Sequence, residues 1–302
     1  MLDVCYLSLG GKTMGALQKY TGGIHDILPP PGTVADEPKP LSLHGLRVSE
    51  EEYWEKYYDN DRIFEWNDGV LEEKPMGDHL SYLMSDWFHS LLKEYLEVNP
   101  VAKIFGTDLG FRLVLPKVTV IRRPDLSVVL NSNPVRFGLL DRSYEGTFDI
   151  CFEFLSDSDR KAAERDTLEK KSEYCAGGIR EYFILDRLGR GTAFYRLNSG
   201  FYSPVLPTSD GVIRSDVLPG FQFCEEHLYT LPPFTELADD PVYSPFVLKG
   251  WQEERSRAAE AGKTAEAERQ KAAKAEEKAE VLAAKLRELG IDPENLQLDA
   301  GC

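Results

Sequence analysis

Acidic and basic residues that could hold a metal ion and activate water occur at three places in the sequence. Asp125 follows Pro124 and opens the apolar run DLSVVL, and Glu153 lies inside the apolar run FDICFEFL. Asp166 and Lys170 follow in RDTLEKKSEYCAGG, four residues apart. Two carboxylates from adjacent strands can hold a divalent cation, and a nearby lysine can orient water or offset charge on a phosphate. Together these residues would be the minimum machinery for hydrolysing a phosphodiester.

Each of these residues also has an ordinary structural explanation. Asp125 stands where an Asp commonly begins a turn. Glu153 would be unremarkable if its face of the strand were exposed, although a buried carboxylate is costly unless it is paired or binds metal. Asp166 and Lys170 could form a surface salt bridge on one face of a helix. The combination is therefore more specific than any of its members.

The order of these motifs resembles the Uma-two family of restriction endonucleases, within the PD-(D/E)xK nuclease superfamily. That family carries a Pro-Asp strand, a Glu strand ending in a Ser-rich turn, and a helix with Asp, Lys and Tyr four apart. The matching segments here are RRPDLSVVL, FEFLSDS and RDTLEKKSEYCAGGIREYFILD, with FEWNDGVLEEKPMGDH upstream and SDVLPGF downstream. The resemblance covers residues 46–225, and the helix ending LRELGIDPENL is similar to the tail of many members.

The resemblance implies that Asp125 and Glu153 are ligands of Mg²⁺ or Mn²⁺ and that Lys170 is the catalytic lysine. In the wider superfamily this lysine lies two residues after the Glu, where this chain has Leu155. We therefore expect Lys170 to reach the site from the following helix instead.

Three further residues match the family near its site and are secondary candidates. Glu65 would add a third carboxylate. His79 would be either a site residue or simply the start of a helix. Tyr174 shares a helical face with Lys170, but a tyrosine there is more often a packing residue than a catalyst.

The elements that must position these residues can be predicted from local patterns. Ser49 and Glu52 form a capping-box pattern at the start of a helix. Asp-Gly between FEW and VLEE predicts a hairpin. The segment HLSYLMSDWFHSLLKEYLEV predicts an amphipathic helix. The apolar residues at helical spacing in that segment are Leu80, Leu83, Met84, Trp87, Leu91 and Leu92.

Short apolar runs separated by Gly, Pro and charged residues predict strands between these helices. We expect an α/β (α+β) domain over residues 46–240, with a restriction-endonuclease-like mixed β-sheet core flanked by helices. Residues 1–45 are Pro-rich and read as a flexible segment. Residues 248–290 predict a long, charged, Ala-rich C-terminal helix, either solvated or weakly self-associating as a coiled coil, and residues 291–302 form a tail.

Composition restricts the class of protein. The net charge of −16 counts against a coat protein that binds nucleic acid indiscriminately, although it does not exclude an enzyme with a local basic groove. The five cysteines include no Cys-x-x-Cys pair, which fits reduced thiols in a cytoplasmic protein. Neither a membrane-spanning run nor a secretory signal is evident.

The leading hypothesis is a metal-dependent DNA endonuclease. Arg112, Arg122 and Arg123 would contact the nucleic acid near the Asp125 strand, or else are solvated surface arginines. A homodimer would fit two-strand cleavage, and the C-terminal helix offers an interface for it. A second hypothesis is a non-cleaving binding or scaffold module that uses the C-terminal helix to recruit a partner. A small-molecule phosphohydrolase is a third.

Overall fold

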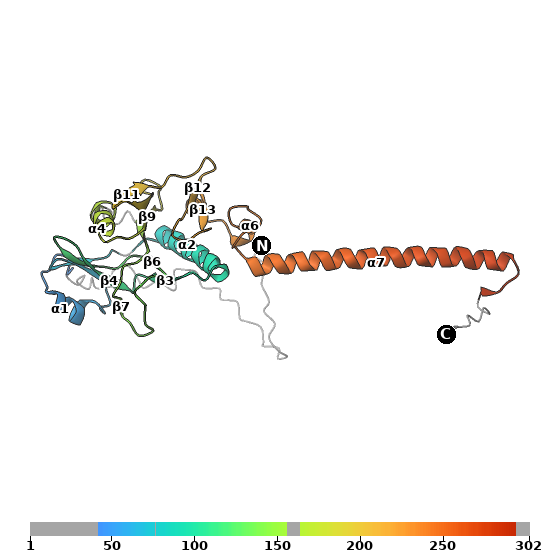
Figure 1. The fold of residues 1–302 in the computed structure, drawn as a ribbon, viewed down its shortest axis with the longest axis horizontal. Coiled ribbons are helices and arrows are strands. Elements are labelled where there is room, and N and C mark those ends of the chain that lie inside the picture. Colours follow the sequence, from blue (N-terminus) through green and yellow to red (C-terminus); the bar gives the residue numbers. More distant parts are fainter. Residues whose placement is uncertain (1–41, 76, 156–163, 294–302) are drawn as a thin grey trace, which may run out of the picture. The chain divides into compact units, whose positions relative to one another are not determined.

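The computed structural model describes residues 42–75, 77–155 and 164–293 (Figure 1). Most of the predicted N-terminal segment 1–45, the Ser-rich turn that follows Leu155 and the end of the C-terminal tail lie outside the described residues.

The helices and strands include those that the local sequence patterns predicted. The helical elements are α1 (Glu50–Glu52), η2 (Tyr53–Tyr57), α2 (His79–Val98), η3 (Arg165–Lys170), α4 (Lys171–Ala176), α5 (His227–Thr230), α6 (Phe234–Leu237) and α7 (Lys249–Glu288), of which η2 and η3 are π-helical. The strands are β1 (Phe64–Asn67), β2 (Val70–Glu73), β3 (Ala102–Gly106), β4 (Gly110–Val114), β5 (Thr119–Arg122), β6 (Leu126–Leu130), β7 (Ser143–Tyr144), β8 (Ile150–Leu155), β9 (Glu181–Asp186), β10 (Ala193–Asn198), β11 (Phe201–Pro204), β12 (Val212–Arg214) and β13 (Gln222–Cys224).

The described strands form two large sheets and one small one. The central sheet has the order β11-β10-β9-β8-β6-β3, with β8 and β9 parallel and the other pairs antiparallel. The second sheet has the order β2-β1-β5-β4-β7, and β12 pairs with β13. This arrangement confirms the predicted α/β class, with a mixed sheet flanked by helices.

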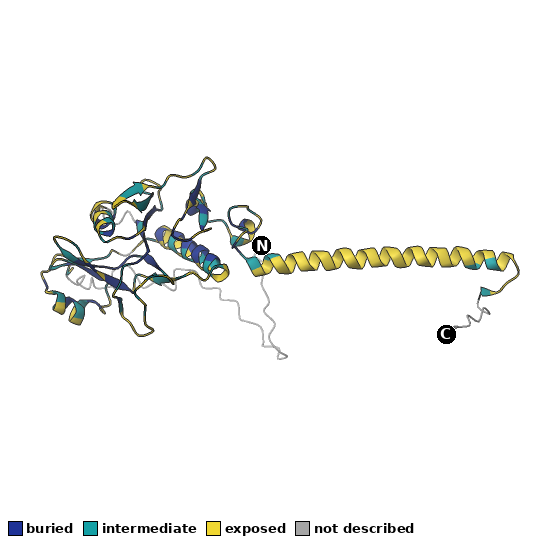
Figure 2. Ribbon diagram, in the orientation of Figure 1, coloured by how far each residue is buried: buried dark blue, intermediate teal, exposed yellow. Residues whose placement is uncertain are grey.

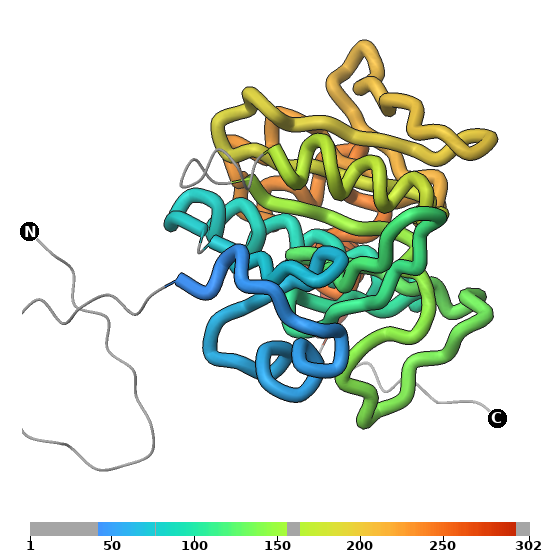
Figure 3. The backbone as a smooth tube through the Cα atoms, turned by 90° about the vertical axis from the view of Figure 1, so that its left-hand side faces the viewer, coloured from blue at the N-terminus to red at the C-terminus, as the bar shows by residue number. Residues whose placement is uncertain are grey.

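Helices cover both faces of the central sheet. On one face Phe88 and Leu92 of α2 pack with Phe152 of β8 and Phe183 of β9 in the largest apolar cluster. On the other face Tyr174 of α4 packs in a second cluster that also contains Cys151, Leu155, Tyr182 and Ile184. Because side chains alternate along a strand, Glu153 lies on the same face as Cys151 and Leu155. Figure 3 shows η3 and α4 as the yellow-green coil that lies on this part of the fold.

Local sequence signals predicted several elements at their observed positions. Ser49 Oγ accepts from the N–H of Glu52 and caps α1. Asp68 and Gly69 both have positive φ and turn β1 back onto β2, as the Asp-Gly hairpin signal requires. Gly177 ends α4, and the positive φ of the following glycine takes the chain away from the helix.

The predicted apolar stripe of α2 was wrong at two positions. Met84, Trp87, Leu91 and Leu92 are buried, but the side chains of Leu80 and Leu83 are exposed. Neither leucine belongs to the apolar cluster between α2 and the central sheet, and Leu83 instead lines a surface hollow with Trp87 and Phe234.

The C-terminal helix α7 is long and solvated. None of its residues is buried, and Figure 2 shows it exposed along most of its length. Among the described residues, no helix is both long enough and apolar enough to cross a membrane.

Candidate active site

Asp125 and Glu153 face each other across two paired strands. β6 and β8 run antiparallel with Leu126 opposite Phe152, so the next pair in this register is Asp125 with Glu153. The N–H of Phe154 donates to Asp125 Oδ2 at 2.8 Å and fixes this carboxylate beside β8. Glu153 is fully buried, whereas the side chain of Asp125 is 28% exposed. The fold therefore brings together the two carboxylates that the sequence predicted as a pair.

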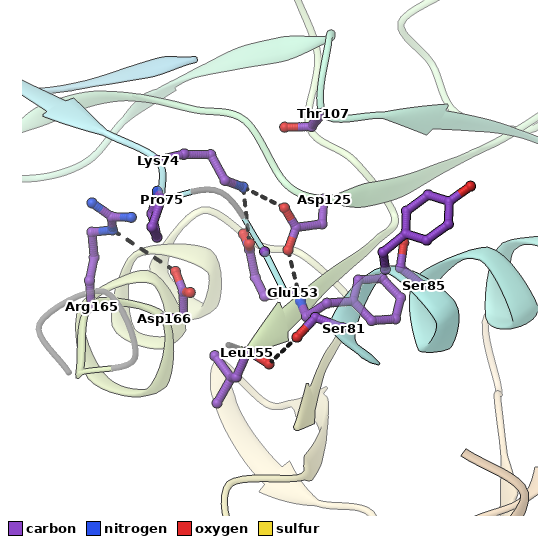
Figure 4. Close-up of a pocket in the computed structure, with 13 residues that line it drawn as sticks. Lys74, Pro75, Ser81, Ser85, Thr107, Asp125, Glu153, Leu155, Arg165 and Asp166 are labelled. Carbon is purple, nitrogen blue, oxygen red and sulfur yellow. Dashed lines mark hydrogen bonds and ion pairs between the residues drawn. The ribbon is translucent and has the colours of Figure 1, made fainter. Parts of the chain in front are cut away.

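The ammonium group of Lys74 lies between these carboxylates. Lys74 directly follows β2, and its Nζ is 2.8 Å from Asp125 Oδ1 and 3.3 Å from Glu153 Oε2 (Figure 4). The same nitrogen donates to the carbonyl oxygen of Arg123 at 2.6 Å. An ammonium has three N–H donors, so each has an acceptor. Carboxylate oxygens from two strands thus converge on one position that already holds a cation.

Lys170 reaches the other side of Glu153 from η3. Its Nζ is 2.9 Å from Glu153 Oε1, 2.9 Å from Asp166 Oδ1 and 3.1 Å from Glu65 Oε1. The hydroxyl of Tyr174 also donates to Glu153 Oε1, at 3.3 Å. Lys170 is fully buried. The lysine therefore approaches the Glu from the helix, as the sequence analysis expected.

A second buried cation, Arg122, pairs with Glu65 and with two further carboxylates. Arg122 donates to both oxygens of Glu173 at 2.7 Å, and its Nη1 contacts Glu72 Oε2 at 2.5 Å and Glu65 Oε2 at 3.3 Å. The backbone N–H of Arg123 donates to the other oxygen of Glu65 at 2.9 Å. Glu65, the secondary candidate, is thereby locked into the protein interior and does not line the cavity described next.

A cavity of about 260 Å³ opens beside Asp125 and Glu153. Lys74, Arg165 and Asp166 line it together with residues from the first turns of α2 (Figure 4). Among the described residues, Lys170 is absent from the lining, because it lies behind Glu153. Asp125, Glu153 and Lys74 therefore lie at the wall of the cavity, whereas the predicted catalytic lysine does not.

The site is part of an ion-pair network with an excess of negative charge. Its described members are the carboxylates Glu65, Glu72, Asp125, Glu153, Asp166 and Glu173 and the cations Lys74, Arg122, Arg165 and Lys170. Six carboxylates face four cations, so the fully ionised network carries two uncompensated negative charges. A divalent cation would supply the missing charge.

Burial and ion pairing act in opposite directions on these groups. Burial raises the pKa of Glu153 to about 7, against the attraction of Lys170 and Lys74. Burial would also raise the pKa of Asp125, but Lys74 outweighs it and holds this pKa below its usual value. For Glu65 the nearby Lys170 and Arg122 likewise outweigh burial and depress the pKa. For Lys170 three carboxylates outweigh burial and raise the pKa. The Asp125 carboxyl therefore loses its proton at a lower pH than the Glu153 carboxyl does.

Other predicted residues lie away from the carboxylate pair. His79 is exposed at the start of α2, where its ring stacks on Tyr82 at a centroid distance of 6.5 Å. Arg112 lies on the surface and pairs with Glu50. The guanidinium of Arg123 is buried and donates to three backbone carbonyls. With Arg122 also buried, only Arg112 of the three predicted contact arginines has an exposed guanidinium.

Four members of the network were not predicted from the sequence. They are Glu72, Lys74, Arg165 and Glu173. The hairpin supplied a usable signal for two of them, because the Asp-Gly turn pairs Glu72 with Glu65. Alternation along β2 then places Lys74 on the same side as Glu72.

Comparison with known proteins assigns the chain to a family of nucleases. Residues 50–230 match the model of the Uma2 family, described as "Putative restriction endonuclease". This match spans more than half of the chain, and the protein therefore belongs to that family. Family membership supports a nuclease, that is, a hydrolase.

A solved structure also resembles the chain. It is described as a putative nuclease of DUF820 from Anabaena variabilis and is 16% identical, with a TM-score of 0.44. The alignment covers 57% of this chain and 92% of that one. The comparison with curated proteins gave no match.

Nucleases of the restriction-endonuclease type typically use divalent metals, and the donors present here fit such an ion. Mg²⁺ is commonly bound by one or two carboxylates and otherwise by water and substrate phosphate. Asp125 and Glu153 supply two carboxylates that already converge on one cation, the Lys74 ammonium. Within the described ranges, no cluster of three or more His, Cys, Asp or Glu side chains is arranged as a metal site, so water and substrate would complete the coordination.

Proposed function

We propose that this protein is a divalent-metal-dependent endonuclease that hydrolyses DNA phosphodiester bonds at Asp125 and Glu153. One observation carries the proposal: oxygens of both carboxylates converge on a single cation position at the wall of a cavity. The two uncompensated negative charges of the ion-pair network favour a divalent ion at that position. Family membership supports the nuclease class.

The proposed reaction is hydrolysis. The oxygen of a water molecule bonds to phosphorus, the bond from phosphorus to the leaving sugar oxygen breaks, and a proton from the water ends on that oxygen. A bound Mg²⁺ or Mn²⁺ would supply Lewis-acid polarisation and a more acidic water. Asp125 and Glu153 would hold this ion from two sides.

Lys170 acts in this proposal by positioning Glu153. Lys170 and Tyr174 both contact Glu153 Oε1, so the Oε2 oxygen is left to face the cavity and the ion. Fixing the carboxylate in this way limits the reorganisation that metal binding requires. In this proposal Lys170 therefore supports the ligand Glu153 rather than contacting the attacking water.

Glu153→Gln tests the proposal, because the substitution keeps the shape of the side chain and removes its charge. We expect metal-dependent cleavage of duplex DNA to be lost while the circular dichroism spectrum and a cooperative thermal transition remain. Unchanged cleavage by this variant would defeat the assignment, and an unfolded variant would move the role of Glu153 to stability.

A catalytically silent binding or scaffold module is the second candidate function. The observation that favours it is the Lys74 ammonium, which already occupies the position between the two carboxylates. Thermal stabilisation by Mn²⁺ separates the two candidates, because an ion that binds only the folded state raises the melting temperature. A nuclease site predicts stabilisation that disappears in Asp125→Asn, and a silent module predicts none in either protein.

We also propose that the protein acts as a homodimer through α7. Cleavage of both strands of a duplex needs two sites, and α7 presents an uncovered surface that could join two copies. Leu282 is 60% exposed near the end of this helix, and Leu289, which directly follows the helix, is 75% exposed. The dimer is independent of the catalytic proposal and is tested separately below.

A further inference from the structure

Among the described lysines, Lys74 is the one that lines the cavity. Its side chain lines the cavity wall, and Lys170 does not. The Lys74 side chain is 10% exposed, and its ammonium is held by Asp125, Glu153 and a backbone carbonyl. A divalent ion bound by the same two carboxylates needs the position that this ammonium occupies. The ammonium and the ion cannot both stand there, because like charges at contact distance repel strongly.

Buried polar atoms without a hydrogen-bond partner also line the cavity. Among the described residues, the donors Arg165 Nε and Thr107 Oγ1 are buried without such a partner, as is the acceptor Asp166 Oδ1, and all three residues line the cavity. The guanidinium of Arg165 lies no closer than 3.8 Å to the carboxylates of Glu72, Glu65 and Asp166. Buried donors are nearly always satisfied in folded proteins, so unsatisfied ones that face a cavity indicate a missing acceptor. The oxygens of a phosphate group are acceptors of the required kind.

We infer that Lys74 is the lysine of this site that contacts the phosphate. A divalent cation makes this contact possible by displacing the Lys74 ammonium from between Asp125 and Glu153. This inference rests on the proposed function. In the metal-free protein the ammonium stands in for the ion and keeps the two carboxylates together. Once displaced, it remains tethered beside the cavity, where Arg165 and Thr107 offer further donors to the same phosphate. Lys74 and Lys170 thus have different tasks, one toward the substrate and one toward Glu153.

Displacement can be measured without DNA by chemical labelling of lysine amines. Reductive methylation of the full chain with formaldehyde and cyanoborohydride, read by peptide mass spectrometry, reports how accessible each amine is. We expect saturating Mn²⁺ to raise the labelling rate of Lys74 about tenfold or more, because an ammonium with three acceptors is shielded until it is released. Lys171, whose ammonium lies over the ring of Tyr195, is the internal control, and its labelling rate should not change.

The phosphate contact is tested by turnover. Lys74→Met should bind Mn²⁺ more tightly than the wild type in a calorimetric titration, because the competing cation is gone. The same variant should nick plasmid about 10²-fold more slowly at saturating Mn²⁺, because a charged contact to the reacting phosphate is lost. A purely structural role would weaken both properties together. Lys171→Met is the matched control and should leave both unchanged.

The outcomes separate this inference from the proposed function. Labelling of Lys74 that does not respond to saturating Mn²⁺ overturns the displacement, and wild-type turnover by Lys74→Met overturns the phosphate contact. If the wild type shows neither Mn²⁺ binding nor nicking, the proposed function fails, and the inference fails with it. If Mn²⁺ binds and releases Lys74 but the wild type cuts no DNA, the displacement stands, and the nuclease proposal and the phosphate contact are both rejected.

Discussion

Arg122 is the residue on which the order of the carboxylates most depends. Its fully buried guanidinium holds Glu65, Glu72 and Glu173, and Arg122→Met would leave these charges uncompensated. We expect a loss of about 3–5 kcal/mol in the free energy of unfolding, measured by urea denaturation. Arg112→Met is the control, because its exposed pair with Glu50 should contribute at most about 1 kcal/mol. Equal stability of the two variants would show that the buried network does not hold the fold.

The same carboxylates predict a loss of stability in acid. The pKa values of Glu65 and Glu72 are depressed below their ordinary value of 4.5, so the folded state binds protons less readily than the unfolded state. Their contribution is therefore present above pH 4.5 and is lost as the pH falls through the depressed values. The pKa of Glu153 is instead raised, to about 7. The contribution of Glu153 to the free energy of unfolding therefore falls as the pH rises from 4.5 to 7.

Urea unfolding at a series of pH values from about 5 to about 3 checks this prediction, because this interval includes the ordinary pKa of a glutamate. We expect the free energy of unfolding to decrease steadily over that interval. The slope should be shallower in Glu65→Gln than in the wild type, because the variant lacks one of the carboxyl groups whose pKa is depressed in the folded state. A variant with the wild-type slope would contradict the assignment of this acid sensitivity to Glu65.

Sequence reasoning identified some of the site residues and missed others for a physical reason. Asp125 and Glu153 stand out locally, because each is an acid beside a strongly apolar strand. Lys74 and Arg165 do not, because a lysine after a hairpin and an arginine on a short helix are ordinary surface patterns. Their burial depends on the packing of β2 and η3 beside β8. These contacts join segments that are far apart in the chain.

At the scale of elements, α2 is the clearest case of structure encoded locally. It begins at His79 after Asp78, whose side chain accepts from the N–H of Ser81 at 3.0 Å and pairs with Arg187. Asp78→Ala removes this N-cap at the cavity end of the helix. We expect a loss of about 1 kcal/mol in the free energy of unfolding.

The control for this prediction is Asp78→Asn, which can still accept from the N–H of Ser81. Asn is as good an N-cap as Asp, so most of the stability should return in a urea titration. If the Asn variant is as unstable as the Ala variant, the pair with Arg187 rather than the cap carries the effect.

The segment containing Asp166 and Lys170 shows where local prediction falls short. The four-residue spacing predicted one face of a regular helix, and the segment does end at its glycine pair. Residues Arg165–Lys170 instead form a π-helical turn, in which Arg165, Asp166 and Lys170 are all buried. Such turns occur frequently at functional sites, and sequence periodicity does not reveal them.

At the scale of the whole molecule, α7 offers a surface for a second copy of the chain. Leu282, Leu286 and Leu289 are spaced four and three residues apart, and Ala275 and Ala279 continue the same spacing toward the N-terminus. This is the a and d spacing of a coiled coil, although alanine contributes little apolar area. The sequence could predict the helix from composition, but no local signal decides between a solvated helix and a paired one.

The dimer prediction is checked by light scattering during size-exclusion chromatography. We expect the mass of a dimer for the wild type, and the mass of a monomer for the double variant Leu282→Glu, Leu286→Glu. The matched control is Glu276→Ala, Glu277→Ala on the same helix, which should remain dimeric. A monomeric wild type at micromolar concentration would contradict the dimer and leave the active-site proposal untouched.

The most direct test of the central claim, a divalent-metal nuclease site at Asp125 and Glu153, is the conversion of supercoiled plasmid to its nicked form. The wild type and Asp125→Asn would be compared in Mn²⁺, in Mg²⁺ and in EDTA. We predict nicking by the wild type with a divalent ion, none in EDTA, and a rate lower by about 10²-fold or more in Asp125→Asn. Nicking by Asp125→Asn at the wild-type rate, or wild-type nicking that persists in EDTA, would contradict the claim.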